Sequence, residues 1–328
     1  MREPNFWYHD GPAARVLSPL GTLYDALGRR RAAGVTPADC GVPVICVGNA
    51  TSGGTGKTPV VIDLARRLQM RGVLVHLLTR GYRGREVGPH PVNPMRDDAA
   101  RVGDEPLLLA RAAPTWVARD RAAGARAAAA EGAQAILMDD GLQNPALKRD
   151  LNVLVIDGAR GFGNGRVIPA GPLRTPLART LAQVHAGVVM GADRTDVARQ
   201  LPRGMPLARA DVEVDSVTRN RLAGMRVLAF CGIGRPDKFY DTLRGLGAEV
   251  AETRGFADHH RYRPSEITGV MEMAKRGGLT PVTTEKDAAR LPAWAQARVE
   301  VVPITLAWTG DAALDRLLHA AVPTRETA

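Results

Sequence analysis

The chain has 328 residues and a mass of 35.0 kDa, which is long for one domain, so we expect two. No apolar run approaches the roughly 20 residues that span a bilayer, and the N-terminus lacks the hydrophobic core of a signal peptide, so we expect a protein on the cytoplasmic side. The net charge of +10 favours an anionic partner, and nucleic acid, acidic lipid and a phosphorylated substrate all fit it.

Residues 1–40 precede the first predicted strand and form a segment of their own. Ser18 followed by Pro19 is typical of an N-cap and a first helical residue, so we expect a helix to begin there. Its apolar stripe consists of Leu20, Leu23, Tyr24 and Leu27, and three arginines follow at residues 29–31. With the aromatic run Phe6-Trp7-Tyr8 upstream, this pattern indicates a membrane-interacting helix. The alternative is a helix that packs on the protein's own core.

A glycine-rich loop joins a predicted buried strand at residues 44–47 to a helical pattern that ends at Gly72. The loop consists of Thr51, Ser52, Gly53, Gly54, Thr55, Gly56, Lys57 and Thr58, and Thr51 stands where the motif G-x-x-x-x-G-K-[ST] has its first glycine. Backbone N–H groups of such a loop point at phosphate oxygens, Lys57 can reach the β- and γ-phosphates, and the Thr58 hydroxyl can bind Mg²⁺. We therefore predict that the chain binds a nucleoside triphosphate.

Two later stretches carry charges suited to a phosphorylated ligand. A predicted strand at 73–78 leads into the basic loop at 79–85, and open α/β sheets bind ligands at the carboxyl ends of their strands. A solvated basic loop is the alternative. Asp104 and Glu105 then stand at the start of a predicted helix. They are either partners of the helix dipole or metal or base groups, and their spacing does not distinguish these roles.

An apolar strand at residues 135–138 ends in two aspartates, Asp139 and Asp140. A strand that ends in aspartate downstream of a phosphate loop is the Walker-B arrangement, which holds Mg²⁺. The stretch from 161 to 174 is rich in glycine and proline and predicts a long functional loop. Basic residues outnumber acidic ones between residues 141 and 180, and this excess suits an anionic ligand.

An alternation of strand-like and helical stretches begins again around residues 218–223, and it predicts a second, smaller α/β unit. Its predicted strands lie at 227–230, 248–251, 281–284 and 299–304, and its predicted helices lie at 237–246, 264–275 and 311–320. The glycines at 232 and 234 are a weak dinucleotide signal because the third glycine is missing. The loop at 256–260 holds a polar cluster, FADHH. The stretch TEKD at 284–287 does not support guanine binding, because its lysine and aspartate are adjacent.

Together these motifs resemble those of a known family, the tetraacyldisaccharide 4′-kinases (lipid A 4′-kinases) of Gram-negative bacteria. The resemblance is carried, in chain order, by VGNATSGGTGKTP, TRGYRGR, VGDEP, MDDGLQ, GNGRVIPAGPLR, FCGIGRPDKF, FADHH and TEKDAARL, which cover roughly residues 5 to 292. The family's loop resembles GN-x-T-x-GGTGKTP, which accounts for Thr51. The combination is highly specific, whereas the phosphate loop alone would indicate only an NTPase.

The resemblance implies transfer of the γ-phosphate of ATP to the 4′-hydroxyl of a lipid disaccharide that carries a 1-phosphate. It implies that Lys57 and the loop amides hold the phosphates, and that Thr58, Glu105 and Asp139 hold Mg²⁺. Asp104 would act as the base or orient it, and a histidine of the second unit would stand beside it, with His259 a better match than His260. The residues expected to contact the substrate are Asn49, Arg80, Asp140, Gln143, Arg166 and Arg174.

The expected fold is α/β: a P-loop NTPase-type, mainly parallel sheet flanked by helices, with a second smaller α/β domain and an N-terminal amphipathic helix. The expected boundaries are 1–40 for the membrane-interacting segment, 41–220 for the kinase core and 221–328 for the smaller domain. We expect a monomer that uses ATP and Mg²⁺, binds a lipid disaccharide at the cytoplasmic face of the inner membrane and binds no nucleic acid. The competing interpretation is a membrane-associated regulatory ATPase, which leaves the second unit and FADHH unexplained.

Overall fold

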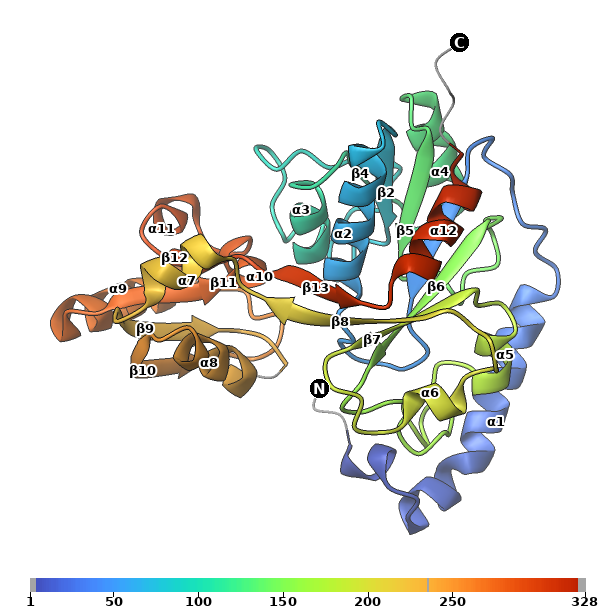
Figure 1. Ribbon diagram of the computed structural model, residues 1–328, viewed down its shortest axis with the longest axis horizontal. Coiled ribbons are helices and arrows are strands. Elements are labelled where there is room, and N and C mark those ends of the chain that lie inside the picture. Colours follow the sequence, from blue (N-terminus) through green and yellow to red (C-terminus); the bar gives the residue numbers. More distant parts are fainter. Residues whose placement is uncertain (1–3, 235, 324–328) are drawn as a thin grey trace.

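The strands of the protein form two separate sheets (Figure 1). The computed structural model describes residues 4–234 and 236–323, so expectations for residues 1–3, Arg235 and 324–328 lie outside the described residues. Within these ranges the larger sheet has nine strands in the order β13-β8-β7-β6-β1-β5-β2-β4-β3. The smaller sheet has four described strands in the order β10-β9-β11-β12. The predicted α/β class with a mainly parallel sheet is confirmed.

The larger sheet places the loop after β1 in the middle of one edge. Its strands are β1 (Val44–Gly48), β2 (Val75–Thr79), β3 (His90–Pro91), β4 (Thr115–Val117), β5 (Ala135–Asp139), β6 (Leu151–Asp157), β7 (Ala186–Met190), β8 (Leu207–Glu213) and β13 (Thr305–Thr309). They pair in parallel except at the two edges, where β3 runs antiparallel to β4 and β13 antiparallel to β8. Because β1 lies between β5 and β6, the loop after β1 meets the carboxyl ends of both neighbours.

Helices cover both faces of the larger sheet. Side chains of a strand alternate between its faces, so Ile45 of β1 packs with α2 (Lys57–Met70) and α12 (Ala312–Ala321), whereas Cys46 packs with α4 (Arg121–Ala130) on the other face. Shorter helices lie beside the sheet at α3 (Asp104–Leu109), α5 (Leu177–Leu181) and α6 (Val197–Gln200). The apolar residues spaced along α2 are buried in this core, which holds the start of α2 rigidly against β1.

The smaller sheet is entirely parallel. Its strands are β9 (Arg226–Cys231), β10 (Glu249–Gly255), β11 (Thr280–Thr284) and β12 (Glu300–Val302). The helices of this part of the chain are α7 (Ser216–Leu222), α8 (Pro236–Gly245), α9 (Pro264–Gly277), α10 (Glu285–Ala288) and α11 (Ala293–Gln296). Figure 1 shows this unit projecting from the larger sheet, to which β8 and β13 lead.

The last part of the chain returns from the smaller sheet to the larger one. The smaller unit therefore ends earlier than in the expected range of 221–328. The predicted single strand over 299–304 stops at Pro303, because proline has no N–H to donate to a ladder. Strand β13 then pairs with β8, and α12 packs on the core of the larger sheet. Arg67 of α2 binds Asp311 and Asp315 at 2.7 Å each. We therefore propose that the smaller unit ends near residue 303.

The N-terminal helix α1 (Pro12–Ala32) begins earlier than predicted, so the expected start at Ser18 is wrong. Pro12 stands in the first turn, where its missing N–H leaves no hydrogen bond unmade, and Pro19 lies inside the helix. The Ser18 hydroxyl donates to the Ala14 carbonyl instead of capping a helix. In the described residues, no helix is both long and apolar enough to cross a membrane.

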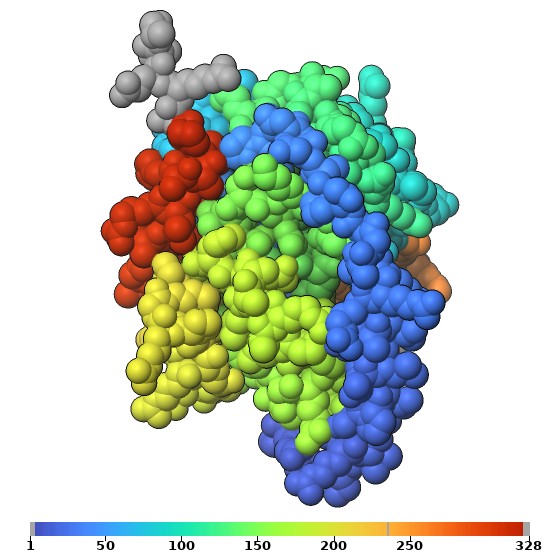
Figure 2. All heavy atoms as spheres, turned by 90° about the vertical axis from the view of Figure 1, so that its right-hand side faces the viewer, coloured from blue at the N-terminus to red at the C-terminus, as the bar shows by residue number. Residues whose placement is uncertain are grey.

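Helix α1 buries a narrow face of two small residues and one acidic residue and exposes its apolar stripe. Its buried residues are Ala14, Gly21 and Asp25, and both Asp25 oxygens accept from Arg179 at 2.7 and 2.8 Å. The exposed stripe consists of Val16, Leu20, Leu23, Tyr24 and Leu27, which are 47–77% exposed. Figure 2 shows this segment, in blue, along the surface of the molecule. The alternative that the stripe packs on the protein's own core is therefore wrong.

The aromatic run upstream of α1 is attached to the long glycine- and proline-rich loop. The indole Nε1 of Trp7 donates to the Pro169 carbonyl at 3.0 Å, and the Asn164 side chain donates to the Phe6 carbonyl at 3.0 Å. The Tyr8 hydroxyl accepts from Arg160 at 3.0 Å. The aromatic run therefore holds residues 6–8 against residues 160–170, and the exposed apolar stripe lies on α1.

Candidate active site

The glycine-rich loop has the backbone shape of a phosphate cradle. Gly53 and Gly56 have φ angles of 109° and 87°, a region that side-chain-bearing residues rarely adopt, and Gly56 directly precedes Lys57 at the start of α2. The Ser52 N–H donates to the Pro172 carbonyl at 2.7 Å, which ties the cradle to the long loop. The carboxyl end of a buried strand and the N-terminus of a fourteen-residue helix thus meet at this loop. An anion would be stabilised by both the amides and the helix dipole.

Three buried oxygens around the cradle have no hydrogen-bond partner among the described residues. They are Asn49 Oδ1, Thr55 Oγ1 and Asp139 Oδ1. Buried polar atoms are nearly always satisfied, so a cluster of unsatisfied ones indicates that a ligand or ion completes the site. Gln143 also lies here, donating to the Asn49 carbonyl at 3.0 Å.

The two aspartates after β5 have opposite electrostatic environments. Burial raises the pKa of Asp139, and the nearby Glu105 carboxylate raises it further. For Asp140, burial also raises the pKa, but Lys57 and Arg174 outweigh it and the net pKa is lowered. Arg174 donates to both Asp140 oxygens at 2.9 and 3.0 Å, and Lys57 Nζ lies 3.9 Å from Asp140 Oδ2. The charges of Lys57 and Arg121 act to lower the Asp139 pKa but do not outweigh these effects, and Asp139 Oδ1 has no hydrogen-bond partner among the described residues.

The residues predicted to bind metal fit Mg²⁺ in their chemistry. Within the described part of the chain, no three His, Cys, Asp or Glu side chains form a cage that could hold an ion alone. Mg²⁺ does not need one, because it is usually bound by one or two carboxylates, with phosphate oxygens and water supplying the rest. The unpartnered Asp139 oxygen, the Glu105 carboxylate that perturbs it and the Thr58 hydroxyl give a hard oxygen donor set of this kind.

The structure brings Asp104 and His259 together although they are 155 positions apart. Nδ1 of His259 lies 2.9 Å from Oδ2 of Asp104. Asp104 is the first residue of α3, beside the larger sheet, whereas His259 lies in the loop after β10 of the smaller sheet. Because an ionised carboxylate only accepts, Nδ1 must carry the proton of this contact, and in the neutral imidazole Nε2 is then an acceptor.

His259 is held in an uncommon backbone conformation, with a φ of 57°. The Arg83 guanidinium donates to the carbonyls of Asp258 and His259 at 3.2 and 3.4 Å. The basic loop after β2 is thus hydrogen-bonded to the loop that carries His259. His260 turns away, with Nε2 at 2.8 Å from Glu266 Oε2. Of the two histidines considered from the sequence, His259 is the one that contacts Asp104.

Asp104 is ionised throughout the neutral range. Burial raises its pKa, but the hydrogen bond from His259 and the charges of Lys286 and Arg290 outweigh burial and lower the pKa to about 2. Because the folded pKa lies below the ordinary value of about 4, this carboxylate stabilises the fold above that value and loses the contribution as the pH falls towards 2. Acid inactivation above pH 4 would therefore come from another group.

Sequence reasoning missed three basic residues at the site. Lys286 and Arg290 lie 3.9 and 3.6 Å from Asp104 Oδ2, and both belong to the TEKDAARL stretch, for which the family resemblance implies no role. Arg121 is buried beside the β5 aspartates; burial and the nearby Arg80 lower its pKa to about 10. No local pattern distinguishes Arg121 from other arginines at helix starts.

Of the residues predicted to contact substrate, all but one gather around the cradle. Asn49, Asp140, Gln143 and Arg174 form one connected set, and Arg80 lies close enough to perturb Arg121. Arg166 is engaged elsewhere: its guanidinium donates to Asp10 at 2.9 and 3.1 Å and to Ser18 of α1. The structure therefore gives Arg166 a role in holding the N-terminal segment.

Asp287 fixes the segment that carries Lys286 and Arg290. This fully buried carboxylate accepts from the Gly232 N–H at 2.8 Å, the Tyr262 hydroxyl at 2.6 Å and Arg290 Nη2 at 2.8 Å. Arg290 is itself 3% exposed. Loss of Asp287 would leave the Gly232 N–H and the Tyr262 hydroxyl without their acceptor and would remove the carboxylate that lies closest to the buried Arg290 guanidinium.

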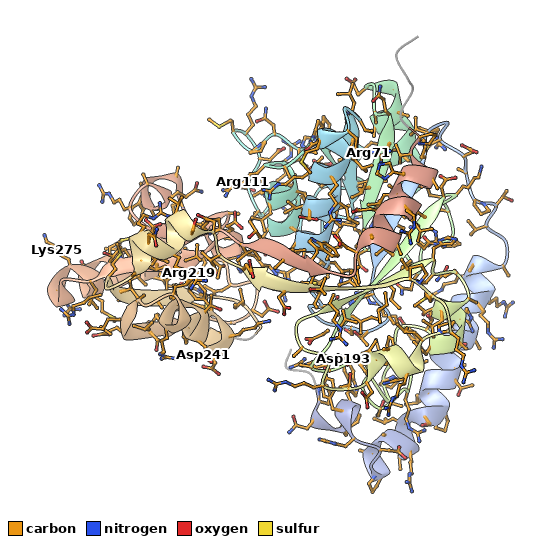
Figure 3. All side chains as sticks on the ribbon, viewed as in Figure 1. Arg71, Arg111, Asp193, Arg219, Asp241 and Lys275 are labelled. Atoms are coloured by element: carbon orange, nitrogen blue, oxygen red, sulfur yellow. The ribbon has the colours of Figure 1, made fainter. Side chains whose placement is uncertain are left out.

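Asp287→Ala should therefore lower the free energy of unfolding by about 3–5 kcal/mol, the usual effect of removing one partner of a buried ion pair. Urea denaturation of both proteins measures the difference. Asp241→Ala is the matched control, because Asp241 is 73% exposed and points outward from the smaller unit (Figure 3). The control should change stability by less than about 0.5 kcal/mol. Equal effects of the two substitutions would contradict the assigned role of Asp287.

Known proteins resemble this chain over almost its whole length. A family model described as tetraacyldisaccharide-1-P 4′-kinase (LpxK) matches residues 13–323. The tetraacyldisaccharide 4′-kinase of Rhodospirillum centenum is 49% identical over 323 residues, covering 97% of this chain and 96% of the relative. That of Methylorubrum extorquens strain PA1 is 51% identical over 331 residues, covering 98% and 99%. The "apo" form of LpxK from Aquifex aeolicus, in complex with ATP, matches with a TM-score of 0.77 and 26% identity, covering 94% and 99%.

Proposed function

The chain belongs to the tetraacyldisaccharide-1-phosphate 4′-kinase family, and we propose that it transfers the γ-phosphate of ATP to the 4′-hydroxyl of a tetraacyldisaccharide 1-phosphate in lipid A synthesis. The observation that carries this proposal is the Asp104–His259 pair, which stands beside the Glu105 and Asp139 carboxylates and the phosphate loop. A base next to a phosphate cradle is what transfer to a sugar hydroxyl requires.

The proposed roles follow from where the side chains lie. Lys57 and the amides of residues 51–58 hold the ATP phosphates, and Thr58, Glu105 and Asp139 hold Mg²⁺, which when bound neutralises charge on those phosphates. His259, oriented by Asp104, accepts the hydroxyl proton at Nε2. The acceptor side of the site consists of Asn49, Arg80, Asp140, Gln143 and Arg174. The contacts among these residues support the assignment.

A position-specific transfer assay tests the function. The purified protein is given ATP labelled at the γ-phosphate and tetraacyldisaccharide 1-phosphate in mixed micelles, and the lipids are separated by chromatography. We expect label on the lipid, at the 4′ position by phosphorus NMR. An acceptor whose 4′-hydroxyl is blocked is the control and should gain none. Label on the blocked acceptor, or on no lipid at all, would contradict the proposal.

We further propose that the protein works as a monomer at the cytoplasmic face of the inner membrane. One chain supplies the phosphate loop, both aspartates of β5 and the Asp104–His259 pair, so the site does not need a second copy. The exposed stripe of α1, followed by the arginines at 29–31, suits an anionic bilayer surface on which the lipid acceptor is embedded.

Replacing Leu20, Leu23 and Leu27 together by serine should weaken binding to anionic vesicles more than 100-fold. Burial of one such side chain contributes roughly 1.5–3 kcal/mol, whereas each arginine near the surface adds only about 1 kcal/mol. High salt should therefore weaken binding of the parent protein only partly. Vesicle cosedimentation measures both effects.

The control for that experiment replaces Leu74 and Met95 by serine, because both are exposed apolar residues that do not belong to α1. The control protein should bind vesicles like the parent. Unchanged binding of the triple variant would show that α1 does not face the lipid.

A further inference from the structure

Lys286 places a charged group where the reaction would take place, and neither the family resemblance nor the sequence assigns it a role. It belongs to α10 of the smaller unit, and its side chain is 26% exposed. Its Nζ lies 3.2 Å from Nε2 of His259, 3.8 Å from Oε1 of Glu105 and 3.9 Å from Oδ2 of Asp104. The ammonium thus stands between the base and a carboxylate of the proposed Mg²⁺ site.

The direction of the hydrogen bond to His259 follows from the donors available. An ammonium has only donors, so Nε2 must be the acceptor in the contact with Lys286. Nδ1 carries the ring proton because Asp104 accepts from it. Lys286 therefore covers the lone pair that would have to accept the proton of the acceptor hydroxyl.

The acceptor hydroxyl and Lys286 cannot occupy this position together. A base must lie about 2.6–3.2 Å from the group it deprotonates, and Lys286 already stands at that distance from Nε2. The backbone of α10 is fixed by the buried Asp287, so any displacement of Lys286 takes place in its flexible four-carbon stem. Glu105 Oε1 lies only 3.8 Å from the ammonium, so a small movement of this stem reaches the proposed metal site, where the ATP phosphates would bind.

We propose that Lys286 is a catalytic residue supplied by the smaller unit: its ammonium covers Nε2 of His259 until the acceptor hydroxyl arrives, and it then contacts the transferring phosphoryl group. This inference rests on the proposed function. In the transfer step the hydroxyl oxygen forms a bond to the γ-phosphorus, the bond from that phosphorus to the β–γ bridging oxygen breaks, and ADP leaves with that electron pair. The hydroxyl proton goes to Nε2, and Lys286 keeps its three protons while stabilising negative charge on the phosphoryl oxygens.

The test compares Lys286→Met and Lys286→Arg with the parent protein. Lys286→Met should lower kcat for lipid phosphorylation about 100- to 1,000-fold, as is typical when one group that stabilises transition-state charge is removed. The dissociation constant for ATP should stay within about threefold, because the phosphate loop is intact. Lys286→Arg keeps the positive charge, so its kcat should be at least about tenfold higher than that of Lys286→Met. Should the methionine variant unfold, Lys286→Gln takes its place.

A measurement without substrates tests the contact itself. In ligand-free protein labelled with ¹⁵N-histidine, the Nε2 signal of His259, assigned by its loss in His259→Gln, should shift in Lys286→Met. Lys275→Met is the matched control, because Lys275 lies exposed at the far end of the smaller unit (Figure 3); it should leave both the signal and kcat unchanged.

An unshifted His259 signal, or a Lys286→Met kcat within threefold of the parent, would overturn the inference. A parent protein that phosphorylates no lipid would instead overturn the proposed function, and the histidine signal would still decide whether Lys286 covers Nε2.

Discussion

Replacement of Lys57 by alanine is expected to abolish phosphoryl transfer while the protein stays folded. Lys57 stands at the first position of α2, and its Nζ lies 3.9 Å from Asp140 Oδ2 rather than in an apolar core. Its ammonium would neutralise charge on the β- and γ-phosphates, and one such group in a preorganised site is worth about 10²–10³-fold or more in kcat. Turnover should therefore fall at least about 100-fold, measured with γ-labelled ATP and the lipid acceptor.

Lys148→Ala is the matched control for this experiment. Lys148 is 60% exposed and pairs with Asp39, and surface pairs of this kind contribute little to stability. It should leave turnover unchanged. The circular dichroism spectra of both variants should match that of the parent. A folded Lys57→Ala protein with turnover near the parent rate would show that the loop does not hold the transferred phosphate.

The second large effect is expected from the pair that joins the two units. His259→Ala and Asp104→Ala should each lower turnover about 10²–10⁴-fold, which is the usual value of assistance by a positioned base. ATP affinity should change little in the histidine variant, because the phosphate loop and the proposed Mg²⁺ ligands remain. Steady-state kinetics at saturating lipid, with a separate ATP-binding measurement, distinguish the two quantities.

The double substitution is the sharper part of this prediction. Asp104 fixes the proton on Nδ1 of His259, so the two side chains act as one unit. Once one of them is replaced, replacing the other should lower turnover little further. The loss in the double variant should therefore be far smaller than the product of the single losses. Strictly multiplicative losses would contradict a dyad. His260→Ala is the control, because His260 binds Glu266 instead, and it should retain turnover within about threefold.

The parts of the site that are local in sequence were predicted from it. The strand, the loop over residues 51–58 and helix α2 carry their own signals, namely an apolar run, clustered glycines and helical spacing. Asp139 follows its strand by the same kind of argument. These predictions hold because each element is determined by residues within a few positions.

The contact between Asp104 and His259 has no local signal. Nothing in the spacing of either residue relates a helix start to a loop of another sheet, and the pairing was expected only from the family resemblance. Lys286 was missed for a related reason. A lysine between two acidic residues is an ordinary surface pattern, and its position at the site depends on the buried contacts of Asp287 with Gly232 and Tyr262.

The errors in the fold arose where one pattern fits two structures. Ser18-Pro19 is a typical helix start, but Pro12 is also a residue that can begin a helix. The contacts of Gly21 and Asp25 with residues 160–180 favour the longer helix. The apolar run at 299–304 resembles one strand, and only its pairing shows that the chain changes sheets after Pro303. Such choices depend on tertiary contacts that periodicity does not contain.

The measurement that separates a kinase from a regulatory ATPase most directly is the destination of the γ-phosphate in a single turnover. Excess protein is mixed with a limiting amount of γ-labelled ATP and saturating tetraacyldisaccharide 1-phosphate, and labelled lipid and free phosphate are counted as ATP disappears. We predict one labelled lipid for each ATP consumed and almost no free phosphate. Recovery of the label as free phosphate, with unmodified lipid, would contradict lipid phosphorylation by this site.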